Sequence, residues 1–295
     1  MNVALTLTGL FGFFWGGFVT PLSIRLAEAF GILDLPDRRK IHARPMPRGA
    51  GLTLWSGCLL WSLYFVSHLN AASVRLCATG ATLVFFCGYM DDIKSLSPFV
   101  RLAVHMAAAA LMVFPLGLPP IHAAICFVWV TGMTSAYNLI DGVNGLCISV
   151  FISSALALGL LSDPYFGAVG AGLALGVFCW NFPRASTFLG DGGSTLLGFL
   201  FASRFVASAS GVLTRARPHE LIFLLFLLGG VPVLDTLFAF SRRVARGKSP
   251  FYPDKGHLHH IIMERIGSSF AAVACLLTLH VALLVCGCAV YARLK

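Results

Sequence analysis

Two adjacent carboxylates, Asp91 and Asp92, end an apolar run in the stretch CGYMDDIKSLSP (87–98). The pair is conspicuous because the 295-residue chain has only 12 Asp and Glu residues. Neighbouring carboxylates raise each other's pKa unless a cation neutralises them, and Mg²⁺ is a hard cation that takes oxygen ligands and substrate phosphate. The pair therefore indicates a cation site. The alternative is that the two acids cap the following helix, with Ser95 or Ser97 as its N-cap residue.

Three further oxygen-bearing side chains end other apolar runs and favour the cation site. Asn138 and Asp141 lie in NLIDGVNGL (138–146), and Asp191 lies in FLGDGGS (188–194), just before an apolar helix. Glycine allows close approach of the backbone, and a helix N-terminus offers free N–H groups to a phosphate. Beside a carboxylate of the kind that binds metal, this turn suggests a diphosphate bridged by Mg²⁺.

Basic and histidine side chains in the same loops are candidates for further contacts to anions. They are Arg38, Arg39, Lys40, His42, Arg48, Arg101, Lys255, His257, His259 and His260. The alternative role for the basic residues is to set membrane orientation, but histidine is mostly neutral at physiological pH and contributes little to orientation. The HLHH segment (257–260) could instead bind a transition metal, although its spacing does not place three imidazoles on one helix face.

The elements that must position these residues are membrane helices. Hydrophobic residues make up 58% of the chain and charged residues 11%, with a mean hydropathy of +0.85. Soluble globular chains carry about 25% charged residues, so a polytopic protein of the lipid bilayer is predicted. The net charge of +9 does not indicate a nucleic-acid partner, because the basic residues cluster in loops between apolar spans.

Apolar runs of roughly 20 residues predict about ten transmembrane helices around one cleft, in a single all-α domain over residues 1–295. The runs lie near 3–25, 51–68, 74–90, 102–118, 121–138, 146–162, 165–181, 193–211, 221–240 and 270–291. Most Lys and Arg residues fall on one side of these runs, and the positive-inside rule places that side in the cytoplasm. The loops of that side are 26–50, 91–101, 138–145, 182–192 and 241–269.

One carboxylate, Asp235 in GVPVLDTLF (230–238), lies inside its predicted span. An intramembrane carboxylate is a functional-site candidate by default. The alternatives are an ion pair with Arg242 or a hydrogen bond to a neighbouring helix. The sequence leaves the role of Asp235 open.

Five loop motifs, taken in order, resemble the polyprenyl-phosphate N-acetylhexosamine-1-phosphate transferases, over about residues 20–265. The RRKIH, PMPR and HLHH forms look closer to the WecA/TagO branch of that family than to the MraY branch. The motifs are DLPDRRKIHARPMPRGAG (34–51), DDIKSLSP (91–98), NLIDGVNGL (138–146), FLGDGGS (188–194) and DKGHLHH (254–260).

The resemblance implies an enzyme of the bacterial inner (cytoplasmic) membrane, with about ten helices around a cleft that faces the cytoplasm. The implied reaction transfers an N-acetylhexosamine 1-phosphate from a UDP-sugar to undecaprenyl phosphate and releases UMP. It depends on Mg²⁺, with Mn²⁺ as a substitute, and begins a cell-envelope polysaccharide such as O-antigen, teichoic acid or exopolysaccharide. The identity of the sugar and the oligomeric state, including a homodimer, stay open.

The resemblance also implies roles for single residues. Asp191 would bind Mg²⁺, with Asn138 or Asp141 as a further ligand. Asp91 and Asp92 would position or deprotonate the lipid phosphate. Phosphate, uracil and sugar contacts would come from Arg39, Lys40, His42, Arg101, Asn144, Phe188, His257, His259 and His260.

Within this set, Arg101 would pair with the lipid phosphate, Phe188 would stack on uracil, and Asn144 would contact the edge of the base. Many members of the family carry Asp where this chain has Asn144, so altered uracil contact is expected rather than lost catalysis.

Two alternatives to this mechanism and function stay in view. A one-step attack by the lipid phosphate is the preferred mechanism, but a covalent route through Asp91 or Asp92 is open. A cation-coupled membrane transporter is the rival function. Transporters place their binding sites near mid-membrane in broken helices, whereas the acids of this chain gather at one membrane border.

Overall fold

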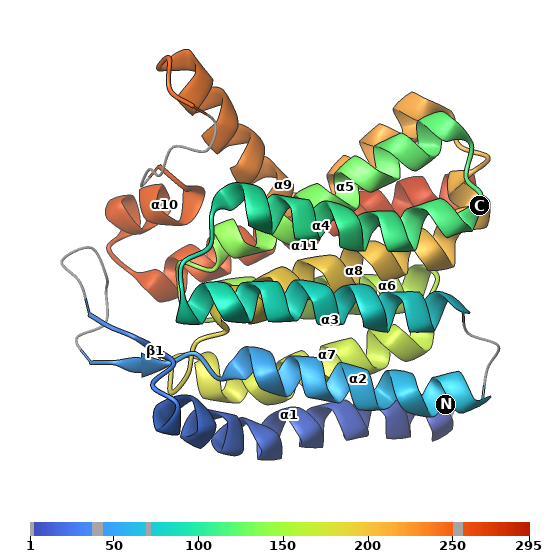
Figure 1. The fold of residues 1–295 in the computed structure, drawn as a ribbon. Helices are drawn as coiled ribbons and strands as arrows, with labels where there is room; N and C mark the ends of the chain where they lie inside the picture. Colours follow the sequence, from blue (N-terminus) through green and yellow to red (C-terminus); the bar gives the residue numbers. More distant parts are fainter. Residues whose placement is uncertain (1–2, 37–43, 69–71, 250–255) are drawn as a thin grey trace.

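A computed structural model describes residues 3–36, 44–68, 72–249 and 256–295, and these form a helical bundle with one small hairpin (Figure 1). The hairpin pairs β1 (Leu33–Asp34) with β2 (Met46–Pro47) in antiparallel register. The helices are α1 (Val3–Ala29), α2 (Ala50–His68), α3 (Ala72–Ile93), α4 (Pro98–Val113), η1 (Phe114–Leu116, a 3-10 turn), α5 (Pro120–Ile140), α6 (Leu146–Leu161), α7 (Pro164–Asn181), α8 (Gly190–Leu213), α9 (Pro218–Ala245), α10 (Leu258–Ile266) and α11 (Ser269–Leu294).

The predicted apolar runs correspond to the long helices, one helix to each run, and α10 is an additional helix of 9 residues. In the described part of the chain, seven helices are long and apolar enough to cross a membrane. The all-α polytopic class is therefore confirmed. The number of ten spans stays a prediction, since α6, for example, has only 16 residues.

Helix α8 is the centre of the bundle and packs against α2, α3, α4, α5 and α6. Inside the bundle, 72% of its most apolar stretch is buried, compared with 22% for α1, which packs at the outer edge against α7. The close approach of α3 to α8 depends on Gly88, because a Cβ atom there would lie 2.5 Å from the carbonyl oxygen of Asp191. This contact brings the end of α3, with Asp91 and Asp92, to the beginning of α8.

Helix α9 bends at Gly230, which has a φ of 53°, and Pro232 follows two residues later. A proline inside a helix removes a backbone hydrogen bond and causes such bends. Next to the non-helical backbone of Gly230, the N–H of Val231 donates to Nδ1 of His280 in α11 at 3.3 Å. The other ring nitrogen of His280 lies 3.0 Å from the hydroxyl of Ser154. The bend directs the C-terminal half of α9 toward the side of the molecule where α10 lies (Figure 1).

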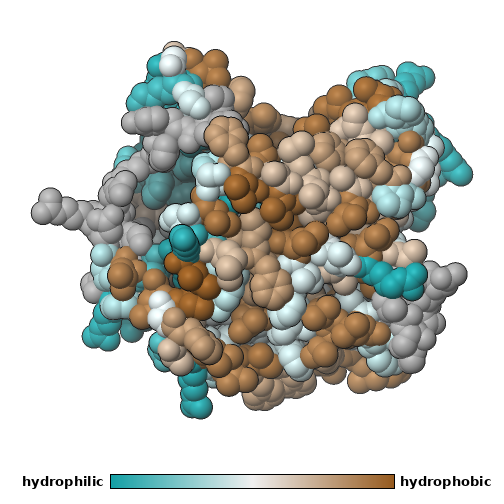
Figure 2. Space-filling view, viewed as in Figure 1, coloured by the Kyte–Doolittle hydropathy of each residue, from teal (hydrophilic) through white to brown (hydrophobic). Residues whose placement is uncertain are grey.

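Polar groups gather at the two ends of the bundle, and apolar side chains cover much of the helix faces between them (Figure 2). The hairpin and α10 lie together at one end, and the labelled chain termini lie at the opposite end (Figure 1). This arrangement is the one expected of a protein whose middle zone faces hydrocarbon.

Candidate active site

A cleft of about 580 Å³ opens at the end of the bundle that carries the hairpin and α10. Its volume is in the range of ordinary small-molecule sites. Seven of the candidate residues from the sequence line it, together with Asp34 and Asn181. Those seven are Arg48, Asn138, Asp141, Asn144, Phe188, Asp191 and His260. The loops that the sequence placed on one side of the membrane therefore meet at one cleft.

The Asp92 carboxylate is almost wholly enclosed, with 1% of its side chain exposed. It accepts hydrogen bonds from the backbone N–H groups of Asp191 at 3.0 Å and Gly192 at 3.2 Å, and from Arg48 at 2.8 Å. The first N–H groups of a helix have no partner within the helix, so Asp92 satisfies two of those at the start of α8. In this geometry Asp92 holds the Gly-rich turn in place.

Asp91 takes part in a different network. One of its oxygens accepts the N–H of Leu96 at 2.5 Å, and the other accepts from Arg101 at 2.7 Å. The same Arg101 nitrogen donates to Asp191 at 3.1 Å, so one guanidinium group lies between two carboxylates. Arg101 and Asp191 each keep 30% of the side chain exposed.

The helix that follows this pair is capped by neither acid. The Ser97 hydroxyl accepts the N–H of Val100 at 3.3 Å, with Pro98 in the first helical turn. Ser97 is therefore the N-cap of α4. The two carboxylates instead make contacts at the start of α8, Asp92 directly and Asp91 through Arg101.

Asn138 belongs to the same cluster as Asp191. Its side-chain nitrogen donates to Asp191 at 3.3 Å, and its oxygen accepts from the hydroxyl of Ser194 at 2.8 Å. Asp141, which follows the end of α5, lines the cleft half-buried and has no side-chain hydrogen bond or ion pair within the described residues. Burial raises the pKa of Asp141 well above its usual value, and the charges of Asp191 and Asp92 add to this effect while Arg48 opposes it.

These oxygens suit a divalent cation that keeps water and substrate phosphate as ligands. The described residues contain no ready-made cluster of three or more His, Cys, Asp or Glu side chains for a metal. Mg²⁺ does not need one, because it is commonly held by one or two carboxylates plus phosphates. Asp191 and Asp141 both line the cleft, and a cation bound there would lower the raised pKa of Asp141. The residues present therefore fit Mg²⁺.

Arg48 connects the hairpin to the cluster. It pairs with Asp92 and also with Asp34, which lies in β1. Burial opposes the charge of Arg48, but the negative charges of Asp92 and Asp34 outweigh that effect and raise the pKa of Arg48. The guanidinium group therefore stays charged at one wall of the cleft.

Another wall is built around Asn181, a buried residue that sequence analysis did not single out. Its side-chain oxygen accepts the N–H of Gly145 at 2.9 Å, and its nitrogen donates to the carbonyl of Thr187 at 2.9 Å. Asn181 thereby ties the loop that carries Asn144 to the loop that carries Phe188. Only its place at the end of a predicted span, in the NFPR segment, could have pointed to it.

The three histidines of HLHH have different environments. His257 is buried and hydrogen-bonded to Asp235 in α9. His259 is 2% exposed, and neither ring nitrogen has a hydrogen-bond partner. Burial lowers the pKa of His259 to about 4, with a further contribution from His260, so its ring is neutral at pH 7. His260 lines the cleft.

Five of the candidate contacts lie outside the described residues, namely Arg38, Arg39, Lys40, His42 and Lys255. Asp34, by contrast, was quoted only as part of a motif, yet it lines the cleft and pairs with Arg48. Asp92 and Arg101 join the cluster through hydrogen bonds to Asp191 or its turn, and Asp91 joins it through Arg101. Among the described HLHH residues and their neighbours, no group suited to holding a transition metal is found.

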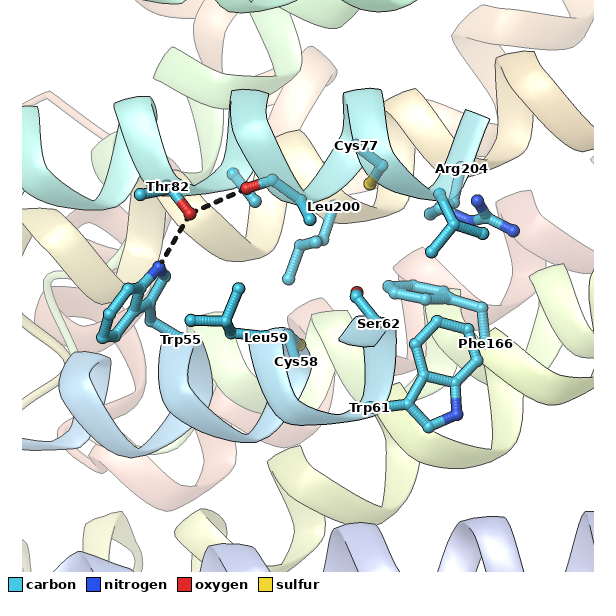
Figure 3. Close-up of a pocket in the computed structure, with 13 residues that line it drawn as sticks. Trp55, Cys58, Leu59, Trp61, Ser62, Cys77, Thr82, Phe166, Leu200 and Arg204 are labelled. Carbon is cyan, nitrogen blue, oxygen red and sulfur yellow. Dashed lines mark hydrogen bonds between the residues drawn. The ribbon is translucent and has the colours of Figure 1, made fainter. Parts of the chain in front are cut away.

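A much smaller cavity, of about 10 Å³, lies between α2 and α3 (Figure 3). It is lined mainly by apolar side chains such as Trp61, Cys58 and Phe166, with Arg204 at its edge, and Trp55 donates a hydrogen bond to Thr82 in its wall at 3.1 Å. Such a volume holds about one water molecule, which excludes a substrate.

Comparison with known proteins identifies the family. A profile of glycosyl transferase family 4 matches residues 74–209, which include Asp91, Asn138 and Asp191. A probable undecaprenyl-phosphate N-acetylglucosaminyl 1-phosphate transferase of Bacillus subtilis is 30% identical over 272 residues, covering 83% of this chain and 73% of the relative. The chain belongs to glycosyl transferase family 4.

Two further relatives within this family have names of the same kind. The undecaprenyl-phosphate alpha-N-acetylglucosaminyl 1-phosphate transferase of Thermotoga maritima is 30% identical, over 85% of this chain and 79% of its own. That of Escherichia coli K12 is 27% identical, over 88% and 76%. The family predicted from the motifs is thus confirmed, and these names give no support to a transporter.

Proposed function

We propose that this family 4 glycosyl transferase moves an N-acetylhexosamine 1-phosphate from a UDP-sugar to undecaprenyl phosphate and releases UMP. The observation that carries the proposal is Asp191, which opens α8 inside the cleft and shares hydrogen bonds with Arg101 and Asn138. A lipid phosphate lies at the border between membrane and water, and the cleft lies at the end of the bundle that carries the hairpin and α10 (Figure 1). The distribution of Lys and Arg supports a cleft that faces the cytoplasm from the bacterial inner membrane.

The acceptor phosphate would lie beside Asp91 and Arg101. An oxygen of the lipid phosphate bonds to the β-phosphorus of the donor, while the bond from that phosphorus to the bridging oxygen of the α-phosphate breaks. UMP leaves with that oxygen. Two anions must meet in this step, so the main barrier is electrostatic, and the charge of Arg101 lowers it.

The two adjacent aspartates differ in what they can do in this step. Asp91 orients or deprotonates the acceptor phosphate. Asp92 already accepts three hydrogen bonds in an enclosed position, so its geometry favours a positioning role over attack. The one-step route needs no covalent aspartyl intermediate.

Mg²⁺, or Mn²⁺ as a substitute, would be held by Asp191 with Asn138 or Asp141, and would supply charge neutralisation to the diphosphate. The donor's uracil would lie against Phe188 and Asn144, whose loops are tied together by Asn181. His260 would contact the sugar-phosphate portion from another wall.

The test is a transfer assay with purified protein, undecaprenyl phosphate, Mg²⁺ and a panel of UDP-N-acetylhexosamines. The expected result is equal amounts of lipid-linked sugar and UMP with at least one donor. EDTA should stop the reaction, and added Mg²⁺ or Mn²⁺ should restore it. Release of no UMP from any donor would sink the proposal.

Membrane orientation and assembly need separate measurements. A cysteine introduced by Ser95→Cys should be labelled only from the cytoplasmic side, and labelling from outside the cell would overturn the orientation. The oligomeric state, including a homodimer, can be measured by sizing in detergent.

A further inference from the structure

The Asp235 side chain on α9 is buried, with 1% of it exposed. Both of its oxygens accept hydrogen bonds from the segment 257–258. One oxygen accepts from Nδ1 of His257 at 2.6 Å. The other accepts the backbone N–H of Leu258, the first residue of α10, also at 2.6 Å. An isolated buried carboxylate is costly, so this pairing links the position of α10 to that of α9.

The sequence alternative, a pair between Asp235 and Arg242, is not what the structure contains. Arg242 instead donates to the backbone carbonyl of Gly256, next to His257. Two polar residues of α9, nearly two helical turns apart, therefore hold the same segment.

The helix anchored in this way carries the two remaining histidines of HLHH. His259 lies directly against the loop that contains Asp141, because a Cβ atom on Gly142 would lie 2.4 Å from Nε2 of His259. Only glycine at this position leaves room for the imidazole. His260, one residue on, lines the cleft.

The buried ring of His259 has two nitrogens without hydrogen-bond partners. Leaving a buried polar group unpaired is unfavourable, so packing and anchoring must compensate for it. Within the described residues, the segment is anchored by the Asp235 contact at the start of α10 and by the bond from Arg242 to Gly256.

We infer that Asp235 is a positioning residue for the donor side of the site: its bonds to His257 and Leu258 hold α10 so that His259 packs against the loop of Asp141 and His260 faces the bound UDP-sugar. The inference rests on the proposed function. It assigns the intramembrane carboxylate to alignment of the nucleotide-sugar end of the cleft and not to the lipid phosphate, which lies with Asp91 and Arg101.

The first test compares the kinetics of Asp235→Asn, Asp235→Glu and wild type, with Glu220→Gln as the control. Glu220 is a carboxylate on the same helix, at its exposed opposite end, where it caps α9 by accepting the N–H of Arg217. Asp235→Asn should raise the KM for the UDP-sugar about tenfold, because hydrogen bonds to a charged acceptor are lost. The KM for undecaprenyl phosphate should change less than twofold, Asp235→Glu should recover part of the loss, and Glu220→Gln should match wild type.

The second test measures hydrogen exchange of the α10 backbone amides, which needs no turnover. Asp235→Asn should speed exchange in α10 at least about tenfold relative to Glu220→Gln. If Asp235→Asn does not fold, His257→Ala removes one partner of the same contact and should give the same two effects.

The outcomes separate the two proposals. An inactive wild-type protein would overturn the proposed transfer reaction. Hydrogen exchange in α10 would still test whether Asp235 holds α10 in place. Unchanged exchange in α10, or an equal rise in both KM values, would overturn the role of Asp235.

Discussion

The two ends of the bundle handle buried acids in opposite ways. At the end with the chain termini, Asp163 caps α7 through the N–H of Phe166 at 3.2 Å and forms a two-donor ion pair with Arg204, whose guanidinium lies 5.5 Å from the centre of the Phe166 ring. The adjacent cavity is about 10 Å³. Asp163 is thus paired with a single base, Arg204, and the cavity beside them is too small for a substrate.

At the cleft, two arginines serve several acids. Arg48 pairs with Asp92, Arg101 pairs with both Asp91 and Asp191, and Asp141 has no side-chain partner in the described chain. The space beside them is about 580 Å³. The comparison distinguishes two kinds of buried acid. Carboxylates such as Asp141, which lacks a basic partner in the described chain and borders a large cleft, indicate a site for a cation and anionic substrates. A carboxylate paired with one arginine beside a cavity too small for a ligand indicates a structural contact.

Asp191→Asn is expected to give the largest effect, a loss of turnover with little loss of stability. The variant should lose about 10²–10³-fold in turnover because a charge that acts on the reacting phosphates is removed. Its melting temperature should stay within a few degrees of wild type, since Asp191 is partly exposed. Transfer assays and thermal unfolding in detergent measure the two effects, with Glu220→Gln as the control. A turnover near that of wild type would remove Asp191 from the mechanism.

The opposite end should respond in stability and not in catalysis. Asp163→Asn leaves the buried Arg204 without its counter-charge, and breaking such a pair costs about 3–5 kcal/mol. The melting temperature should fall, while turnover per folded molecule should stay at the wild-type value. Adding Arg204→Met to Asp163→Asn should recover much of the lost stability. A selective loss of turnover would mean that this end takes part in the reaction.

A smaller effect is expected from Asn181→Ala, which unties two walls of the cleft. Losing the hydrogen bonds to Gly145 and Thr187 should cost about 1–3 kcal/mol and loosen the loops that carry Asn144 and Phe188. The KM for the UDP-sugar should rise more than the KM for undecaprenyl phosphate. Steady-state kinetics with each substrate varied in turn measures this, and equal changes would count against a role at the donor side.

The smallest effect is expected at the N-cap of α4. Ser97→Ala should lower stability by about 1 kcal/mol, the usual cost of losing a cap. Turnover should stay within twofold of wild type, because the helix still holds Arg101. Chemical denaturation measures the stability change. A turnover loss as large as that of Asp191→Asn would show that Ser97 contributes to the site directly.

Much of the fold was predictable from sequence because its signal is local. Apolar runs such as 121–138 and 270–291 match α5 and α11 within a few residues, and the loops of one predicted side do meet at the cleft. The boundaries were less certain. Helix α8 begins at Gly190, before the predicted start at 193, because glycine and Asp191 can occupy the first turn when a neighbouring carboxylate satisfies its N–H groups.

The sequence by itself determined the membrane class, the order of the loops and the acids at one border, since hydropathy and motif spacing need no knowledge of distant contacts. Only the tertiary structure distinguished Asp91 from Asp92, tied Asn181 to two loops and gave Asp235 its partners in α10. Asp92 and Asp191 are 99 positions apart in the chain but in direct hydrogen-bond contact. Which of two adjacent carboxylates pairs with Arg101, and which accepts the N–H groups at the start of α8, depends on how α3 packs against α8, and no local pattern encodes that choice.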